Sequence, residues 1–163
     1  MSRPWVLNAS PLIALTKVSL LHVADALCSE FVVPSGVAAE VREGPEDDPA
    51  RIWLEQAGSK RVVDVGEAHS AVVSWDLGVG ETQVLSYAYT HPGAEAILDD
   101  RAARTCACAL TIPVRGTLGV ILLAKKHGAI PAVEPVLREL MAAGFRIGPE
   151  LIRSVLGLAG ELP

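Results

Sequence analysis

The residues best suited to chemistry in this sequence are one amide and four carboxylates from segments far apart along the chain. They are Asn8, Glu40, Glu81, Asp99 and Asp100. Clustered carboxylates repel one another unless a proton or a cation lies between them. Oxygen donors select hard divalent ions such as Mg²⁺ and Mn²⁺, and such an ion can activate water for in-line displacement at phosphorus. If these side chains meet, they would support metal-dependent hydrolysis of a phosphodiester.

Each of these residues also has an ordinary structural interpretation. Asn8 and the two aspartates follow apolar runs, where Asn and Asp commonly form turns and helix caps. Glu81 can complement a helix dipole from the first turn, and Glu40, at the edge of an apolar helix face, can pair with a neighbouring arginine. The five residues together support a functional site better than any one of them does alone.

Short apolar runs alternate with helical patterns along the whole chain and predict one α/β domain. Strands are expected over residues 4–7, 31–33, 61–65, 94–98 and 112–114. Helices are expected over residues 12–16, 20–27, 35–41, 51–57, 81–89, 101–110, 118–127, 133–143 and 150–158. Strands separated by helices imply a mainly parallel sheet with helices on both faces, a three-layer sandwich.

Local signals define some of the expected helix ends. Ser10 followed by Pro11 is a favourable N-cap and first-turn pair. Gly128 and Gly144 are placed to end helices in the left-handed conformation. Ligands of parallel sheets bind beyond the carboxyl ends of the strands, which is where Asn8 and the two aspartates are expected.

The composition limits the classes of protein to consider. The 163 residues include 14 Lys and Arg and 19 Asp and Glu, a net charge of −5, and half of the residues are hydrophobic. The charge argues against broad electrostatic adsorption to nucleic acid, and the apolar content argues against disorder. No apolar run reaches the ~18–20 residues of a membrane span, and the N-terminus lacks the layout of a secretory signal. We therefore expect a soluble cytoplasmic protein.

Three cysteines, an odd number, argue against a disulfide framework. Cys106 and Cys108 lie inside a predicted helix and point to different faces of it. A zinc site is therefore disfavoured, and we expect reduced, buried thiols.

Five stretches of the sequence, in this order, resemble the PIN domain family of metal-dependent ribonucleases. They are residues 6–15 (VLNASPLIAL), 33–41 (VPSGVAAEV), 78–83 (GVGETQ), 97–104 (ILDDRAAR) and 116–119 (GTLG). The chain is also similar, through residues 144–147 (GFRI), to a poorly characterised subfamily often found beside small antitoxin-like proteins. The resemblance implies a single PIN-like domain over residues 1–163, with a C-terminal helical extension at about 130–163.

The resemblance also implies a function and a set of site residues. It implies a toxin-type endoribonuclease that uses Mg²⁺ or Mn²⁺, acts on RNA, pairs with a small antitoxin protein and forms a homodimer. The implied catalytic acids are Glu40, Glu81 and Asp100. The implied metal ligands are Asn8, Glu40, Glu81, Asp99 and Asp100, and the implied substrate-binding residues are Ser10, Arg101, Arg104 and Thr117.

Asn8 departs from the family, whose first strand ends in an aspartate that binds the metal. The amide removes one negative charge, so weaker metal binding and a slow or inactive nuclease are expected. A catalytically inactive PIN-like protein that binds protein or nucleic acid is therefore the alternative. Ser10 also remains open as a plain helix cap, and Arg101 and Arg104 as partners in helix-end salt bridges.

Other classes of enzyme lack their sequence signatures here. The stretch from Gly78 to Gly80 lacks the third glycine of a dinucleotide-binding loop, and there is neither a P-loop nor a G-x-S-x-G motif. A phosphoreceiver domain would have its paired acids after the first strand. The histidines show no metal-ligand spacing.

Overall fold

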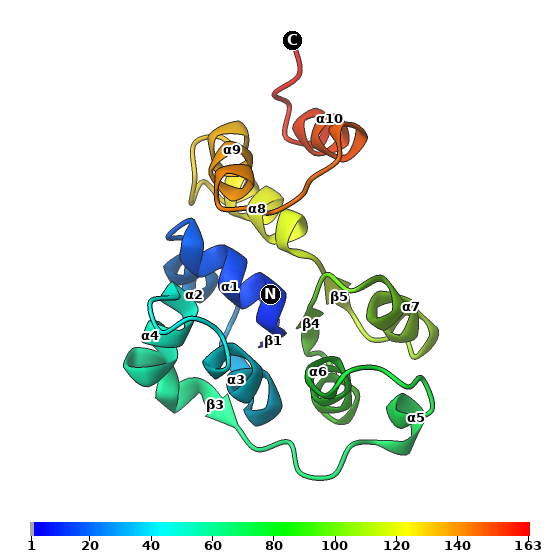
Figure 1. Ribbon diagram of the computed structural model, residues 1–163. Coiled ribbons are helices and arrows are strands. Elements are labelled where there is room, and N and C mark those ends of the chain that lie inside the picture. The colour runs from blue at the N-terminus through cyan, green and yellow to red at the C-terminus, as the bar shows by residue number, and fades with distance from the viewer. Residues whose placement is uncertain (1) are drawn as a thin grey trace.

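The computed structural model describes residues 2–163 and contains one parallel sheet of five strands (Figure 1). The strands are β1 (Trp5–Leu7), β2 (Phe31–Pro34), β3 (Val62–Val63), β4 (Glu95–Ile97) and β5 (Val114–Arg115). Their order is β3-β2-β1-β4-β5, and each neighbouring pair is parallel. Trp5 in the central strand lies opposite Phe31 on one side and Glu95 on the other.

Helices cover both faces of this sheet, which confirms the predicted three-layer α/β sandwich. The helices are α1 (Ala9–Lys17), α2 (Leu21–Leu27), α3 (Ser35–Arg42), α4 (Pro49–Glu55), the 3₁₀ helix η1 (Ala57–Arg61), α5 (Ser70–Val73), α6 (Val79–Thr90), α7 (Arg101–Ala109), α8 (Thr117–Lys126), α9 (Glu134–Ala142) and α10 (Pro149–Leu158). Helices α3, α6 and α7 follow one another along one face, and α1, α2 and α8 pack on the other (Figure 1).

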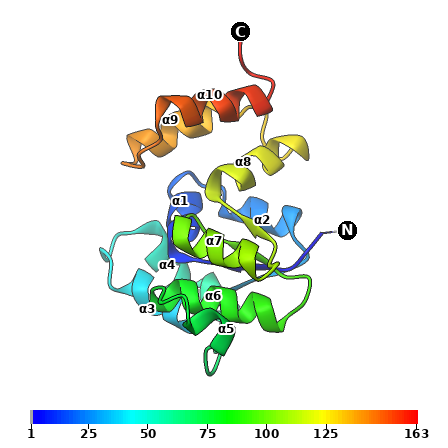
Figure 2. The same cartoon turned by 90° about the vertical axis from the view of Figure 1, so that its right-hand side faces the viewer.

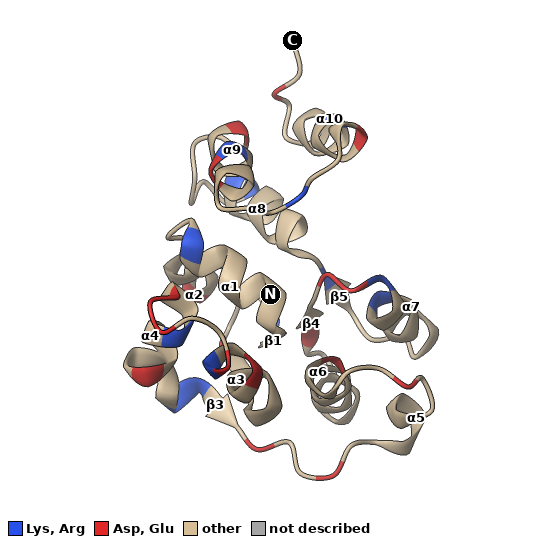
Figure 3. Ribbon diagram, in the orientation of Figure 1, with Lys and Arg blue, Asp and Glu red and all other residues tan. Residues whose placement is uncertain are grey.

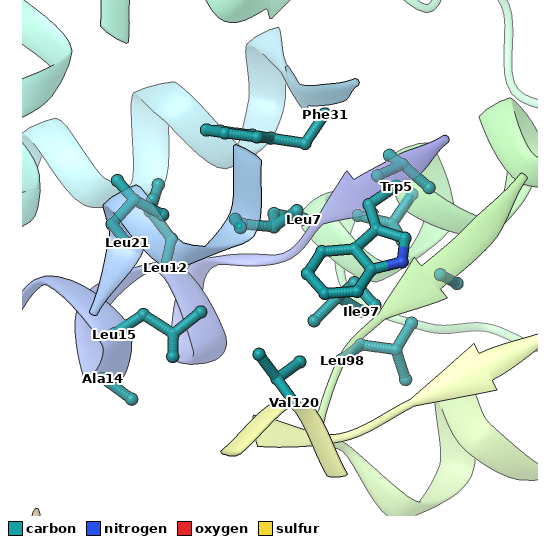
Figure 4. Packing of buried hydrophobic residues seen from close by; sticks show 14 of the residues in the cluster. Trp5, Leu7, Leu12, Ala14, Leu15, Leu21, Phe31, Ile97, Leu98 and Val120 are labelled. Carbon is teal, nitrogen blue, oxygen red and sulfur yellow. The ribbon is translucent and has the colours of Figure 1, made fainter. Parts of the chain in front are cut away.

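The core lies between the central strands and these helices. The Trp5 side chain is buried beside Ile97, Leu98 and Val120, which come from β4, the residue after it and α8 (Figure 4). Burial of one such large side chain contributes ~1.5–3 kcal/mol. The Trp5 Nε1 donates a hydrogen bond to Glu95 Oε2 at 3.1 Å, so the polar atom of the indole is also satisfied.

The structure corrects the predicted N-cap at Ser10. Helix α1 begins at Ala9, and Asn8 occupies the N-cap with extended backbone angles. The Leu12 amide donates to the carbonyl of Asn8, so the first helical hydrogen bond starts two residues before the predicted cap. Pro11 is tolerated because the first turn of a helix needs no hydrogen bond from that nitrogen.

Two predicted strands differ from the observed ones. The strand expected over residues 112–114 is found at Val114–Arg115. Thr111 has a positive φ of 58°, and the Ile112 amide donates to Ala107, so Ile112 closes the end of α7 instead of joining the sheet. The strand expected over residues 61–65 pairs only at Val62–Val63, and the short helix α5 was not predicted.

The last two helices, α9 and α10, lie beyond the sandwich, and α10 packs on α8 (Figures 1 and 2). Gly144 has a φ of +97°, and the Phe145 amide donates to Leu140, which confirms the predicted helix end at Gly144. Gly128, with a φ of +73°, likewise follows the end of α8.

Among residues 2–163, no individual helix has both the length and the apolar character of a membrane span. By length and composition alone, α1 and α2 satisfy that criterion together as a pair bent by 112°.

Candidate active site

Asn8 stands at the junction of β1 and α1, at the rim formed by the carboxyl ends of the strands. The residue is only 3% exposed. The Nδ2 donates a hydrogen bond to Glu81 Oε1 at 3.1 Å, whereas Oδ1 is buried and accepts no hydrogen bond from any residue in the range 2–163. A buried acceptor without a partner costs ~1–3 kcal/mol, so Asn8 carries an oxygen that a bound ligand could satisfy.

Glu40 and Gly80 complete the surroundings of this oxygen. A Cβ atom at Gly80 would lie 2.9 Å from Glu40 Oε2 and 3.0 Å from Asn8 Oδ1. The two oxygens therefore flank one point at the start of α6, and Glu81 occupies the next position of that helix. The Gly36 amide donates to Gln83 Oε1 at 2.8 Å, which fixes α3 against α6 and so brings Glu40 toward Glu81.

The charge on this group is only partly compensated. Partial burial, together with the carboxylates of Glu81 and Glu43, raises the pKa of Glu40 above its ordinary value. The Asn8 amide is the one neutral donor that reaches Glu81 by a side-chain hydrogen bond among the described residues. A cation placed between the two glutamates would relieve the same repulsion.

Asp99 forms a second group on the same rim. Its carboxylate accepts hydrogen bonds from Ser10 Oγ at 3.1 Å, from Thr117 Oγ1 at 2.6 Å and from the Thr117 amide at 2.8 Å. Ser10 lies in the first turn of α1 and Thr117 opens α8, so Asp99 connects these two helix starts. Because Ser10 is two residues from Asn8, the two groups are neighbours on the rim.

Asp100, by contrast, caps a helix. Its Oδ2 accepts a hydrogen bond from the Ala103 amide at 2.9 Å, and Asp100 is the N-cap residue of α7. Asp100 thus makes the contact that its ordinary structural interpretation expects, and the catalytic and metal-binding roles implied for it stay predictions. Its neighbour Asp99 is the acid that contacts the other residues of the rim.

Arg101 and Arg104 face a cavity beside Asp99. Within residues 2–163 neither arginine forms an ion pair with an acid. The alternative interpretation of these arginines, a helix-end salt bridge, is therefore wrong. The cavity, of about 990 Å³, is also lined by Ser10, Asp99 and Thr117. Four of the sequence-predicted residues thus share one cavity with Asp99.

The three cysteines are free thiols that differ in burial. Cys28 and Cys106 are buried, and burial raises the pKa of the Cys28 thiol to about 12. Cys108 is exposed, so the expectation of buried thiols is wrong for this residue. Two residues separated by two positions on a helix point to different faces, and only one of these faces meets the core.

Over the described part of the chain, no three His, Cys, Asp or Glu side chains converge closely enough to hold a metal ion. The amide of Asn8 instead donates to Glu81, and its Oδ1 flanks the same point as Glu40 Oε2. All donors of this group toward a cation are oxygens, and one of them is buried without a partner. The residues present therefore fit a hard divalent ion, bound by fewer charges than three carboxylates would supply.

Several residues around the site were missed by sequence reasoning. Gly80 and Gly116 leave room beside the oxygens, since a Cβ atom at Gly116 would lie 3.0 Å from Asp99 Oδ1. Both glycines lie inside the stretches quoted above, so the motifs contained a signal for them. Phe145 and Arg146, which line the cavity, come from the C-terminal extension, and no spacing in the sequence places them there.

A comparison to known families agrees with the fold. The model of a family described as PIN domain matches residues 4–161. The chain belongs to the PIN domain family, whose fold is nuclease-like and whose members generally use divalent metal ions. No curated protein matches the sequence.

Proposed function

We propose that this protein is a metal-dependent ribonuclease of the PIN type that cleaves RNA phosphodiesters with Mg²⁺ or Mn²⁺. The observation that carries the proposal is the buried, unpartnered Oδ1 of Asn8 beside the Glu40–Glu81 pair. Such a group is suited to a hard cation, and nothing in an ordinary helix cap requires it.

Asn8, Glu40 and Glu81 would hold the ion, and Asp99 is the acid on the adjoining part of the rim. When bound, the ion supplies the activation of water and the neutralisation of phosphate charge. The raised pKa of Glu40 reflects its partial burial and the neighbouring carboxylates in the ion-free protein, and a bound cation would offset this repulsion. Ser10 and Thr117 orient Asp99 through their hydrogen bonds, and Arg101 and Arg104 are suited to bind phosphate oxygens.

Asn8 explains why this activity should be weak. A unit charge at ~4 Å from another interacts by ~4 kcal/mol at an effective dielectric constant of about 20, and a dication doubles that attraction before desolvation is subtracted. Because the side-chain amide of Asn8 is uncharged, it lacks this attraction to the ion. The amide also stabilises Glu81 in the absence of an ion, which favours a second candidate: an inactive PIN-like protein that binds protein or nucleic acid.

We further propose, from the family resemblance alone, that the protein is a toxin component, that a small antitoxin protein is its partner and that it forms a homodimer. Sedimentation of the purified protein tests the dimer. Co-expression with the product of an adjacent small gene tests the antitoxin partner.

Cleavage of a mixed RNA pool with Mg²⁺ or Mn²⁺ tests the enzymatic proposal. We expect slow cleavage that Asp99→Asn abolishes, because Asp99 faces the rim. Asp100→Asn is the matched control and should retain most of the activity, because asparagine also caps helices well. The proposal fails if neither the protein nor its Asn8→Asp variant cleaves RNA with either ion. Abolition by Asp100→Asn alone would show that the wrong acid has been assigned.

A further inference from the structure

The cavity beside Asp99 extends away from the strand ends to the C-terminal extension. It begins at Ser10, Asp99 and Thr117 and ends at the segment that joins α9 to α10, residues 143–148. The extension therefore forms one wall of this cavity, and α7 forms another. Figure 2 shows where α7, α9 and α10 lie in the molecule. We call it the extension groove.

The extension groove concentrates positive charge in an acidic protein. Its lining includes Arg101, Arg104, Arg115 and Arg146, four of the 14 Lys and Arg residues of the chain, but only one of the 19 acids, Asp99. Blue segments on α7, at β5 and between α9 and α10 border the same region in Figure 3. The net charge of −5 therefore hides a local site for anions.

Three of these four arginines are available to a ligand. Arg115 donates from Nε to Glu95 Oε1 at 3.0 Å, which holds it in place. Arg101, Arg104 and Arg146 form no ion pair with an acid in the range 2–163. Arg146 is exposed and belongs to a different element from the arginines of α7.

Most of the remaining lining is apolar, and Phe145 is its aromatic member. The turn at Gly144 reverses the chain after α9 and directs Phe145, Arg146 and Ile147 into the wall of the groove. Phe145 is half-buried and packs against the core, so its ring is held in position. Lys17 Nζ also lies 6.0 Å from the centroid of this ring. An aromatic ring and unpaired guanidinium groups that line one groove suit single-stranded nucleic acid, whose bases stack on rings while its phosphates meet cations.

We propose that the extension groove binds single-stranded RNA on the way to Asp99, with Arg146 contacting a phosphate and Phe145 contacting a base. This inference rests on the proposed function for the identity of the nucleic acid. A duplex buries its bases in its own stack, whereas a single strand presents them to a side chain. The groove would make the C-terminal extension part of substrate binding, at a distance from the metal-binding group.

Binding measured without divalent ions separates this inference from catalysis. A fluorescent single-stranded RNA of about 12 nucleotides is titrated with the protein in EDTA, and its anisotropy is recorded at several salt concentrations. We expect Arg146→Ala to weaken binding ~3–10-fold and to reduce the slope of log affinity against log salt by about one, the effect of one lost phosphate contact. Arg153→Ala, an exposed arginine of α10 outside the groove, is the matched control and should change neither quantity.

Phe145→Leu tests the stacking contact while keeping apolar volume in the wall. We expect it to weaken RNA binding without changing the salt dependence, because the lost contact is uncharged. Equal affinities for Arg146→Ala and Arg153→Ala, or an unchanged affinity of Phe145→Leu, would overturn the inference.

Cys108 offers an independent readout, since it is exposed and lines the groove. Bound RNA should slow the reaction of this thiol with a maleimide. Protection by an acidic polypeptide but not by RNA would overturn the inference in favour of a protein ligand. RNA binding that requires Arg146 without any cleavage would support the groove and refute the nuclease. Cleavage that does not depend on Arg146 would support the nuclease and refute the groove.

Discussion

At the scale of single residues, Asn8 is both a hydrogen-bond donor and an open acceptor. Its Nδ2 donates to Glu81, which an aspartate at this position could not do. Without a cation, a third carboxylate next to Glu40 and Glu81 would add repulsion to a buried position. The amide therefore stabilises the ion-free protein at the expense of affinity for the ion.

Asn8→Asp should reverse this balance. We expect the variant to be ~1–3 kcal/mol less stable than the natural sequence in EDTA, because it loses a buried hydrogen bond and gains a buried charge. We expect Mg²⁺ to raise its melting temperature more than that of the natural protein, since a ligand stabilises in proportion to its affinity. Thermal unfolding over a series of Mg²⁺ concentrations measures both. Equal responses of the two proteins to Mg²⁺ would contradict the assignment of this group as a cation site.

At the same scale, the sequence identified Asn8, Glu40 and Glu81 as candidates, and the family resemblance implied Asp100, with Asp99 only as a further metal ligand. Adjacent acids after a strand differ only in where the next helix begins. The structure places Asp100 at the N-cap of α7, whereas Asp99 accepts hydrogen bonds from the hydroxyls of Ser10 and Thr117. Helix boundaries are uncertain by one or two residues even in known structures, so this choice required coordinates.

At the scale of elements, the packing of α3 on α6 determines whether the two glutamates meet. Gly80 lies at the point where α6 approaches α3 and β1. A Cβ atom at this position would be too close to the side-chain oxygens of Glu40 and Asn8. The first turn of α6 therefore does more than begin a helix, because its glycine leaves space next to the oxygens.

Gly80→Ala should occupy that space. Glycine to alanine ordinarily favours a helix by ~1 kcal/mol, but here the new methyl group would displace the carboxylate of Glu40 and press on the buried amide of Asn8. We expect at least about tenfold weaker Mn²⁺ binding, measured by titration calorimetry, because a misplaced ligand no longer coordinates. Gly148→Ala, with open space around the position, is the control and should bind Mn²⁺ normally. Unchanged binding by Gly80→Ala would place the ion elsewhere.

The extension is attached by Glu161 near the C-terminus. Its carboxylate accepts hydrogen bonds from Lys125 Nζ at 2.7 Å and from the amides of Val133 and Glu134 at 2.7 and 2.9 Å. These contacts, foremost the hydrogen bond from Lys125, lower the pKa of Glu161 to about 2 from an ordinary 4.5. Glu161 thus caps the N-terminus of α9 and also binds Lys125 of α8.

Acid should loosen this attachment in a defined pH range. A carboxyl group with a lowered pKa stabilises the fold fully above its ordinary pKa, and that contribution declines below about 4.5 and is lost as the pH falls through about 2. We expect the amide protons of Val133 and Glu134 to lose protection over this range, measured as the exchange rate relative to the intrinsic rate of each amide at the same pH. Glu161→Gln should show fast exchange already at neutral pH. Exchange rates that are the same in both proteins at pH 7 would exclude this role for Glu161.

The elements themselves were largely predictable, since the alternation of apolar runs and helical patterns requires a parallel sheet. The predicted strand at Ile112 and the predicted N-cap at Ser10 were wrong because a polar atom of each residue has a different hydrogen-bond partner. Ile112 is apolar and next to a strand, but its amide closes α7. Ser10 is a good cap by type, but the helix starts earlier and its hydroxyl binds Asp99 instead.

At the scale of the whole molecule, the proposed cation-binding group and the proposed RNA-binding groove occupy adjoining parts of the rim at the carboxyl ends of the strands. The Asn8, Glu40 and Glu81 group lies at one part of it, and Asp99 with the extension groove lies at the adjoining part. The net charge of −5 gave no indication of this arrangement, because a sum over the chain does not report how arginines gather. Arg146 reaches the groove only through the packing of the extension on α8, which local sequence patterns do not encode.

The most direct test of the account is a crystal of the protein soaked in Mn²⁺ and examined by anomalous diffraction. We expect a peak within coordination distance of Asn8 Oδ1 and of a carboxylate oxygen of Glu40 or Glu81. Density that avoids all three residues at saturating Mn²⁺, or that lies instead between Asp100 and solvent, would contradict it.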